Sequence, residues 1–191
     1  MEGNLIPSLL ILVGPKHSGK TSTGKALASL ISGIFIDLDD EIARRSGTAP
    51  RELFRQGESV FRNAELEATK GLLEFINMNH EADDTKPYII ATGGGIVDNG
   101  EAMSLLKQGG LIIYLEITSQ TAWKRILHSA ERTGELPPFL KTEDPEKTHR
   151  SLHERRALLY KDMADLIIDA EQEPPEARAR EILHQLTHKM P

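Results

Sequence analysis

Short apolar runs alternate along this chain with longer stretches in which apolar and polar positions repeat at helical spacing. The apolar runs, rich in Ile, Leu and Val, lie at residues 9–13, 34–37, 88–92, 111–116 and 166–169. The stretches of helical spacing lie at about residues 20–32, 58–77, 99–108, 119–129, 145–162 and 175–188. This alternation is typical of a parallel sheet with helices packed on both faces. The pattern therefore predicts an α/β fold of three layers around a five-stranded parallel sheet.

The composition limits the classes of protein and of partner. With 191 residues, 39% of them hydrophobic, the chain can build one compact core, so we expect a single domain over residues 1–191. It has no cysteine, which excludes disulfides and thiolate metal sites and suits the cytoplasm. Its net charge of -6 lacks the positive field that gathers nucleic acid, so we expect no such partner. We expect no membrane partner or signal peptide, because the first apolar run is too short and follows no basic segment.

Residues 14–21 match the phosphate-loop pattern G-x-x-x-x-G-K-[ST], and they stand between a predicted strand and a predicted helix, as that pattern requires. Its glycines let backbone amides curl around phosphate oxygens, its lysine reaches the terminal phosphates, and its threonine hydroxyl can hold Mg²⁺. The residues that we assign to ATP here are Gly14, Pro15, Lys16, His17, Ser18, Gly19, Lys20 and Thr21. The loop indicates a nucleotide but not the fate of its phosphate, because switches, motors and kinases share it.

Two aspartates follow the second predicted strand, where parallel sheets bind ligands. Asp37 and Asp39 fall on the same side if the strand continues that far, because side chains alternate with a period of two. One carboxylate could then help to hold hydrated Mg²⁺ while the other binds or deprotonates an acceptor hydroxyl. The alternative is that Asp39 or Asp40 caps a helix beginning near Glu41.

Two further segments could bind an acceptor. Arg62 and Glu65 are three residues apart on one helical face, so the carboxylate could fix a guanidinium that binds an acceptor carboxylate. The alternative is an exposed ion pair. Gly93, Gly94 and Gly95 end the third predicted strand and could present bare backbone amides to a ligand, although such runs are also ordinary turns.

In order and spacing, five segments resemble the shikimate kinase family: GPKHSGKT, FIDLD, LFRQGESVFR with Glu65 after it, ATGGG, and RRALLY. The resemblance covers nearly the whole chain and implies the nucleoside monophosphate kinase-like fold, with sheet order 2-3-1-4-5. It also implies a substrate-binding helical region at about residues 38–65 and a closing lid at about residues 130–145. The implied reaction transfers the ATP γ-phosphate to the 3-hydroxyl of shikimate, in aromatic amino-acid biosynthesis, and the resemblance favours a monomer.

The resemblance also implies roles for individual residues. Asp39 would bind the shikimate hydroxyl and act as the base, Asp37 would lie near Mg²⁺ with Thr21, and Arg132 would stack on adenine. The implied catalytic residues are Lys20, Asp37, Asp39 and Arg62. The implied substrate-binding residues are Asp39, Phe61, Arg62, Gly93, Gly94, Gly95 and Arg156. By pattern alone, Arg156 would be a solvated helix residue no different from Arg155 beside it.

The sequence departs from the family pattern in the lid. The family has an arginine before Pro-Leu, where it reaches the phosphates, whereas this chain has Pro137, which carries neither charge nor backbone donor. Arg132, Lys141 and Arg150 are the candidates to replace it, and if Arg132 stacks on adenine, Lys141 or Arg150 remains. The departure keeps two alternatives open: a kinase of the same fold for another hydroxylated carboxylic acid, or a non-catalytic nucleotide-binding regulatory protein.

Two histidine pairs have the four-residue spacing of a helical metal site, His149 with His153 and His184 with His188. No H-E-x-x-H motif or third ligand accompanies them, so we interpret both pairs as polar helix faces. Trp123 is predicted to pack in the core and not to stack on a base.

Overall fold

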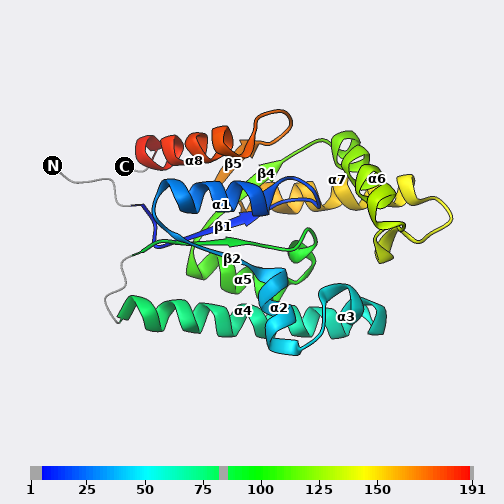
Figure 1. The fold of residues 1–191 in the computed structure, drawn as a ribbon, viewed down its shortest axis with the longest axis horizontal. Helices are drawn as coiled ribbons and strands as arrows, with labels where there is room; N and C mark the ends of the chain where they lie inside the picture. Colours follow the sequence, from blue (N-terminus) through cyan, green and yellow to red (C-terminus); the bar gives the residue numbers. More distant parts are fainter. Residues whose placement is uncertain (1–5, 82–85, 190–191) are drawn as a thin grey trace.

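The computed structural model describes residues 6–81 and 86–189, and within them the strands form one parallel sheet of order β2-β3-β1-β4-β5 (Figure 1). The strands are β1 (Leu9–Val13), β2 (Ile34–Asp37), β3 (Tyr88–Ala91), β4 (Leu111–Glu116) and β5 (Leu166–Asp169). All four strand pairs are parallel, with Ile11 of β1 facing Ile90 of β3 and Ile112 of β4. The predicted fold class and strand order are confirmed.

Helices cover both faces of this sheet (Figure 1). The α-helices are α1 (Lys20–Leu30), α2 (Leu38–Ser46), α3 (Pro50–Gln56), α4 (Glu58–Glu81), α5 (Gly100–Gly109), α6 (Ser119–Thr133), α7 (Pro145–Met163) and α8 (Pro175–Lys189). Two short 3₁₀ helices are η1 (Ile96–Asp98) and η2 (Pro138–Leu140). None of the helices in the described part of the chain is both long enough and apolar enough to cross a membrane.

The central strand shows why the apolar runs lack alternation. Leu9, Ile11 and Val13 of β1 belong to a core shared with α2, α4, α5 and α7. Leu10 and Leu12 belong to a second core, shared with α1 and α8 on the other face. Every residue of β1 is buried, and burying apolar side chains on both faces is the main favourable term in folding. Burial on both faces stabilises the sheet, and the carboxyl ends of its strands lead into the phosphate loop, the start of α2 and the glycine run.

The predicted element boundaries hold within a few residues at most places, and the exceptions are informative. The helix predicted over residues 58–77 continues to Glu81, and the helix over 119–129 continues to Thr133, so the predicted lid begins within α6. The hydrophobic pattern did not indicate α2 and α3, although both lie in the region that the resemblance marks as helical. Each has fewer than ten residues, which is too short for a clear 3.6-residue period.

Candidate active site

The phosphate loop is a tight turn between β1 and α1. Gly14 and Gly19 have positive φ angles of 142° and 93°, and a Cβ on Gly14 would lie 2.6 Å from the carbonyl oxygen of Leu115. A side chain at that position would therefore push the loop away from β4. The Nζ of Lys20, which is 7% exposed, donates to the carbonyl oxygens of Gly14 at 2.9 Å and Pro15 at 2.8 Å. Burial lowers the pKa of Lys20 to about 8, although Asp39 partly offsets the effect.

Two arginines donate hydrogen bonds to backbone carbonyls of this loop, and the sequence analysis identified neither of them. Arg125 of α6 donates to the carbonyl oxygen of His17 at 3.0 Å and to that of Glu171 at 2.7 Å. Arg178 of α8, only 5% exposed, donates to the carbonyl oxygen of Ser18 at 3.2 Å. Arginines in amphipathic helices usually extend into solvent, so no local feature of the sequence indicates that these two side chains contact the loop. Together they tie the phosphate loop to the segment that follows β5.

The two aspartates meet in a way that the strand interpretation did not predict. β2 ends at Asp37, as the predicted range 34–37 has it, and α2 begins at Leu38, so the condition for placing Asp37 and Asp39 on the same side of a strand is not met. The capping alternative was also misplaced, because Asp37 is the cap: its Oδ1 accepts a hydrogen bond from the Asp39 backbone N–H at 3.0 Å. Its Oδ2 accepts from the Thr21 hydroxyl at 2.8 Å. Asp37 therefore joins the start of α1 to the start of α2.

Asp39 lies in the first turn of α2, half-buried, and faces the glycine run after β3. A Cβ on Gly93 would lie 3.1 Å from its Oδ1. Burial raises the pKa of Asp39, and the neighbouring carboxylate of Asp37 raises it further, while Lys20 acts in the opposite sense. A carboxylate with a raised pKa is a stronger base, so this position suits proton transfer.

Arg62 and Glu65 are not the exposed ion pair that was the alternative. Glu65 is 1% exposed, and its Oε2 accepts from Arg62 Nη1 at 2.9 Å and from Asn99 Nδ2 at 3.0 Å. Burial raises the pKa of Glu65, although the charge of Arg62 opposes the change. Arg62 Nη1 also donates to the carbonyl oxygen of Gly95 at 2.9 Å. The guanidinium is therefore fixed from two sides, as a carboxylate-binding arginine needs to be.

Arg156 and Arg155 have different environments, and the resemblance selected the less exposed of the two. The Arg156 side chain is 15% exposed and that of Arg155 is 52% exposed. Both bind Asp98, a residue that the sequence analysis did not single out: Arg156 donates to Oδ2 from Nε at 2.9 Å and from Nη2 at 2.6 Å. Arg155 Nη2 donates to Oδ1 at 2.7 Å, and Arg62 Nη2 lies 3.5 Å from Oδ2. Burial opposes ionisation of Asp98, yet the arginines hold its pKa below its usual range.

The glycine run connects this arginine cluster to the phosphate loop. A Cβ on Gly95 would lie 3.1 Å from Nη2 of Arg156 and 3.2 Å from Nη2 of Arg62. A Cβ on Gly94 would lie 2.6 Å from the backbone nitrogen of Lys16. Gly94 and Gly95 lie in a turn, and the guanidiniums and the phosphate loop approach the run too closely for side chains.

One cavity of about 890 Å³ joins these parts. Its wall includes two residues of the phosphate loop, the aspartate predicted to act as the base, the two arginines predicted to bind the acceptor carboxylate, and aromatic side chains. Among the lining residues are Lys16, His17, Asp39, Phe54, Phe61, Arg62, Gly93, Gly94, Gly95, Asp98, Pro137, Phe139 and Arg156. The volume is within the range of small-molecule sites. Of the phosphate loop, only Lys16 and His17 line the cavity, and Lys20, Thr21 and Asp37 lie outside its wall. Arg132 is also absent from the wall and is exposed at the end of α6.

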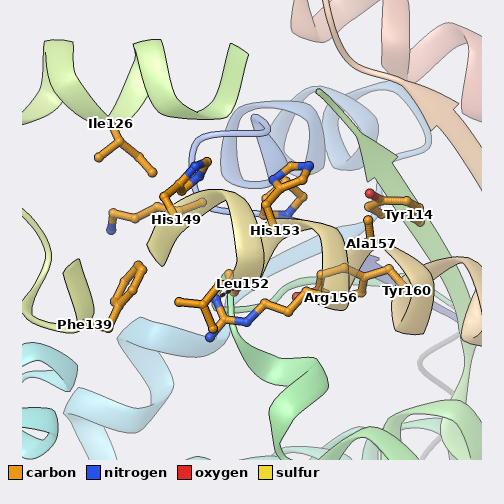
Figure 2. Close-up of a pocket in the computed structure, with 12 residues that line it drawn as sticks. Tyr114, Ile126, Phe139, His149, Leu152, His153, Arg156, Ala157 and Tyr160 are labelled. Carbon is orange, nitrogen blue, oxygen red and sulfur yellow. Dashed lines mark hydrogen bonds between the residues drawn. The ribbon is translucent and has the colours of Figure 1, made fainter. Parts of the chain in front are cut away.

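A second, smaller cavity of about 20 Å³ lies along α7, large enough for one water molecule. Figure 2 shows His149, His153 and Arg156 along this helix, with Ile126 and Phe139 at one end. The polar-face interpretation is wrong for His149, which is 6% exposed and packs against Trp123, with ring centroids 5.4 Å apart and the ring planes tilted by 33°. Burial lowers the pKa of His149 to about 4.

The same interpretation fits the other histidine pair. His184 and His188 are exposed, and their rings stack on the surface of α8 with centroids 4.1 Å apart. The prediction that Trp123 packs in the core is wrong, because the residue is half-buried, contacts His149 and lies outside the two main cores. Within the described residues, no group of three or more His, Cys, Asp or Glu side chains could hold a metal ion.

The fold and this cavity define a class of protein: a P-loop kinase that acts on a small acceptor. Comparison with known families confirms the resemblance, since a family model described as "Shikimate kinase" matches residues 16–187. The shikimate kinase of Nitrosococcus oceani is 35% identical over 93% of this chain and 86% of its own length. That of Nitrosospira multiformis is 32% identical over 93% of this chain and 84% of its own. The chain belongs to the shikimate kinase family.

Solved structures agree with this assignment. A shikimate kinase from Acinetobacter baumannii, solved in complex with shikimate, superposes with a TM-score of 0.78 at 32% identity, covering 94% of this chain and 92% of that one. A gluconokinase from Sinorhizobium meliloti superposes with a TM-score of 0.54 at 14% identity, covering 94% and 91%. The second likeness shows the fold alone, so the fold does not choose the acceptor and the site must do so.

Proposed function

We propose that this protein phosphorylates the 3-hydroxyl of shikimate with ATP, producing shikimate 3-phosphate for aromatic amino-acid biosynthesis. One observation supports the proposal above all others: a single cavity is lined by the phosphate loop, by Asp39 and by the pair Arg62 and Arg156. A hydroxylated carboxylic acid offers a carboxylate to the arginines and a hydroxyl to the aspartate. Phosphate donor and acceptor can therefore meet in one space from which closure excludes water.

In the proposed reaction, the acceptor hydroxyl oxygen forms a bond to the γ-phosphorus while the bond from phosphorus to the β–γ bridging oxygen breaks. The hydroxyl proton passes to the Asp39 carboxylate, whose raised pKa favours its uptake. The leaving ADP keeps the electron pair of the broken bond. Lys20 turns from the loop carbonyls to the phosphate oxygens, where its positive charge stabilises the transferring group.

The proposal includes Mg²⁺ bound near Thr21 and Asp37. The hydroxyl of Thr21 and the carboxylate of Asp37 are 2.8 Å apart at the exposed mouth of the phosphate loop. Both are oxygen donors, which Mg²⁺ prefers, and two protein ligands are enough because the ion keeps several waters and phosphate oxygens. When bound, the ion neutralises charge on the phosphate oxygens.

We further propose that residues 38–65 form the acceptor-binding region and that residues 130–145 close over the cavity as a lid. The first range contains α2, α3 and the start of α4, which supply Asp39, Phe54, Phe61 and Arg62 to the wall. The second range contains Pro137 and Phe139, which line the opposite side. Arg132 stays our candidate for the adenine contact, and the enzyme is proposed to work as a cytoplasmic monomer without a nucleic-acid or membrane partner.

The test is a coupled assay of ADP formation that depends on shikimate, with Lys20→Ala as the matched inactive control. We expect turnover in the unsubstituted protein and a loss of several orders of magnitude in the variant, because a main phosphate contact is removed. ADP formation that is independent of shikimate, or turnover only with another hydroxy acid, would reject shikimate as the acceptor. Size-exclusion chromatography tests the monomer.

A further inference from the structure

Phosphoryl transfer spreads negative charge over the equatorial oxygens of the moving group, and cations must meet that charge. The phosphate loop supplies Lys20. Arg62 and Arg156, the proposed acceptor-binding arginines, are already hydrogen-bonded to carboxylate or carbonyl oxygens. The segment over residues 134–144 faces the cavity with four side chains. These are Glu135, Pro137, Pro138 and Phe139, and none is cationic.

Arg51 of α3 places a guanidinium beside this segment. Its Nη2 donates to the carbonyl oxygen of Leu136 at 3.3 Å, which is the carbonyl directly before Pro137. The same atom lies 2.6 Å from Oε1 of Glu135. Arg51 also lines the large cavity, together with Lys16 of the phosphate loop. Its Nε is buried and has no hydrogen-bond partner among the described residues, while the side chain as a whole is 38% exposed, so this part of the site does not use all the donors of the guanidinium.

The cations suggested by the sequence do not reach the cavity wall. Lys141 is bound to Oε2 of Glu135 at 2.8 Å and Arg150 to Glu146 at 3.4 Å, and both side chains are more than half exposed. Neither residue, nor Arg132, lines the cavity. This arrangement therefore does not support Lys141 or Arg150 as the replacement for the lid arginine.

We propose that Arg51 is a further catalytic residue, whose guanidinium binds oxygens of the transferring phosphoryl group from the lid side of the cavity. In this arrangement Glu135 orients the guanidinium of Arg51. The positive charge then comes from α3, and it replaces the charge that the lid lacks because position 137 is a proline. The inference rests on the proposed function and deepens it, because it names how the same site meets the phosphate charge.

The chain offers a matched control. Arg55 stands on the same helix and pairs with the same Oε1 of Glu135, at 3.3 Å, but it does not line the cavity. We would compare four proteins: the unsubstituted chain, Arg51→Ala, Arg55→Ala, and the double variant Arg51→Ala with Pro137→Arg. The readouts are kcat and both KM values in the coupled assay, and the thermal unfolding midpoint, which checks that each variant folds.

We expect Arg51→Ala to lower kcat by about 10²-fold, the usual effect of removing one transition-state donor, with little change in either KM. Arg55→Ala should stay within about twofold, because an exposed ion pair contributes little. The double variant should recover about tenfold or more over Arg51→Ala, since it returns an arginine to the lid.

Two results would overturn the inference while leaving the proposed function intact. One is an equal loss in Arg51→Ala and Arg55→Ala, which would mean that the pairing with Glu135 is all that matters. The other is a loss confined to the KM for shikimate, which would assign Arg51 to acceptor binding. Absence of shikimate-dependent turnover in the unsubstituted protein would overturn the proposed function itself, and this inference with it.

Discussion

Replacing Asp98 by asparagine tests whether a built-in carboxylate holds the arginine cluster together. Asp98 accepts three hydrogen bonds from Arg155 and Arg156, and Arg62 lies 3.5 Å away. Asn keeps the shape but removes the charge, which leaves three guanidiniums close together without their shared anion. Breaking a buried ion pair costs about 3–5 kcal/mol, and the half-exposed Arg155 contact adds about 0–1 kcal/mol. Because the Asp98 side chain keeps 12% exposure, we expect a loss of about 3 kcal/mol in unfolding free energy.

Thermal and urea unfolding measure this loss directly. For a chain of this length, about 3 kcal/mol corresponds to a decrease of roughly 6–12 °C in the unfolding midpoint. Glu146→Gln is the control, because its pair with Arg150 is exposed on both sides and should contribute less than about 0.5 kcal/mol.

The same variant should respond more strongly to shikimate. A ligand carboxylate can meet the positive charge that Asp98 no longer meets, so saturating shikimate should raise the midpoint of Asp98→Asn by more than that of the unsubstituted protein. Two results would refute the view that Asp98 and the acceptor carboxylate bind the same arginines. One is a variant as stable as the unsubstituted protein, and the other is a variant whose unfolding midpoint rises less with shikimate.

Three other predictions follow from the same geometry. Gly94→Ala should lower kcat/KM by about 10²-fold, because its Cβ would displace the backbone of Lys16, whereas Gly100→Ala, with open space around it, should change nothing measurable. The affinity for ATP, measured by calorimetry, should fall above about pH 8 as Lys20 loses its proton, and Lys20→Arg should abolish that dependence. His149 is neutral in the folded state down to about pH 4, whereas the unfolded chain binds the proton near pH 6.5. The contribution of His149 to the unfolding free energy is therefore complete above pH 6.5 and decreases on acidification, by about 2–3 kcal/mol at pH 4.5. Urea titrations of His149→Gln should show a weaker dependence of the unfolding free energy on pH.

The phosphate loop could be predicted from sequence because its chemistry is local. Eight consecutive residues carry the glycines, the lysine and the threonine, and the flanking strand and helix have clear hydrophobic patterns. Asp37 and Asp39 show where local reasoning ends. The end of the strand at Asp37 was predicted, but the start of α2 at Leu38 depends on the cap that Asp37 provides, which no hydrophobic pattern records.

Residues whose roles depend on distant contacts could not be predicted in this way. Arg155 and Arg156 are chemically identical neighbours, and only the packing of α7 against η1 buries one and exposes the other. Asp98 looks like an ordinary turn residue until the folded chain brings it to α7, which lies 57 and 58 positions further along. Arg51 likewise reaches Leu136 across 85 positions of sequence.

The anchoring of the phosphate loop by Arg178 has a consequence for how the protein is made. The loop is translated 160 positions before Arg178 of α8, whose side chain donates to the carbonyl oxygen of Ser18. β1, which leads into the loop, must also wait for its neighbours β3 and β4. A nascent chain still attached to the ribosome therefore carries the nucleotide motif in full without being able to hold it in shape. ATP binding should begin only when α8 has left the exit tunnel, long after the residues of the loop itself have been joined.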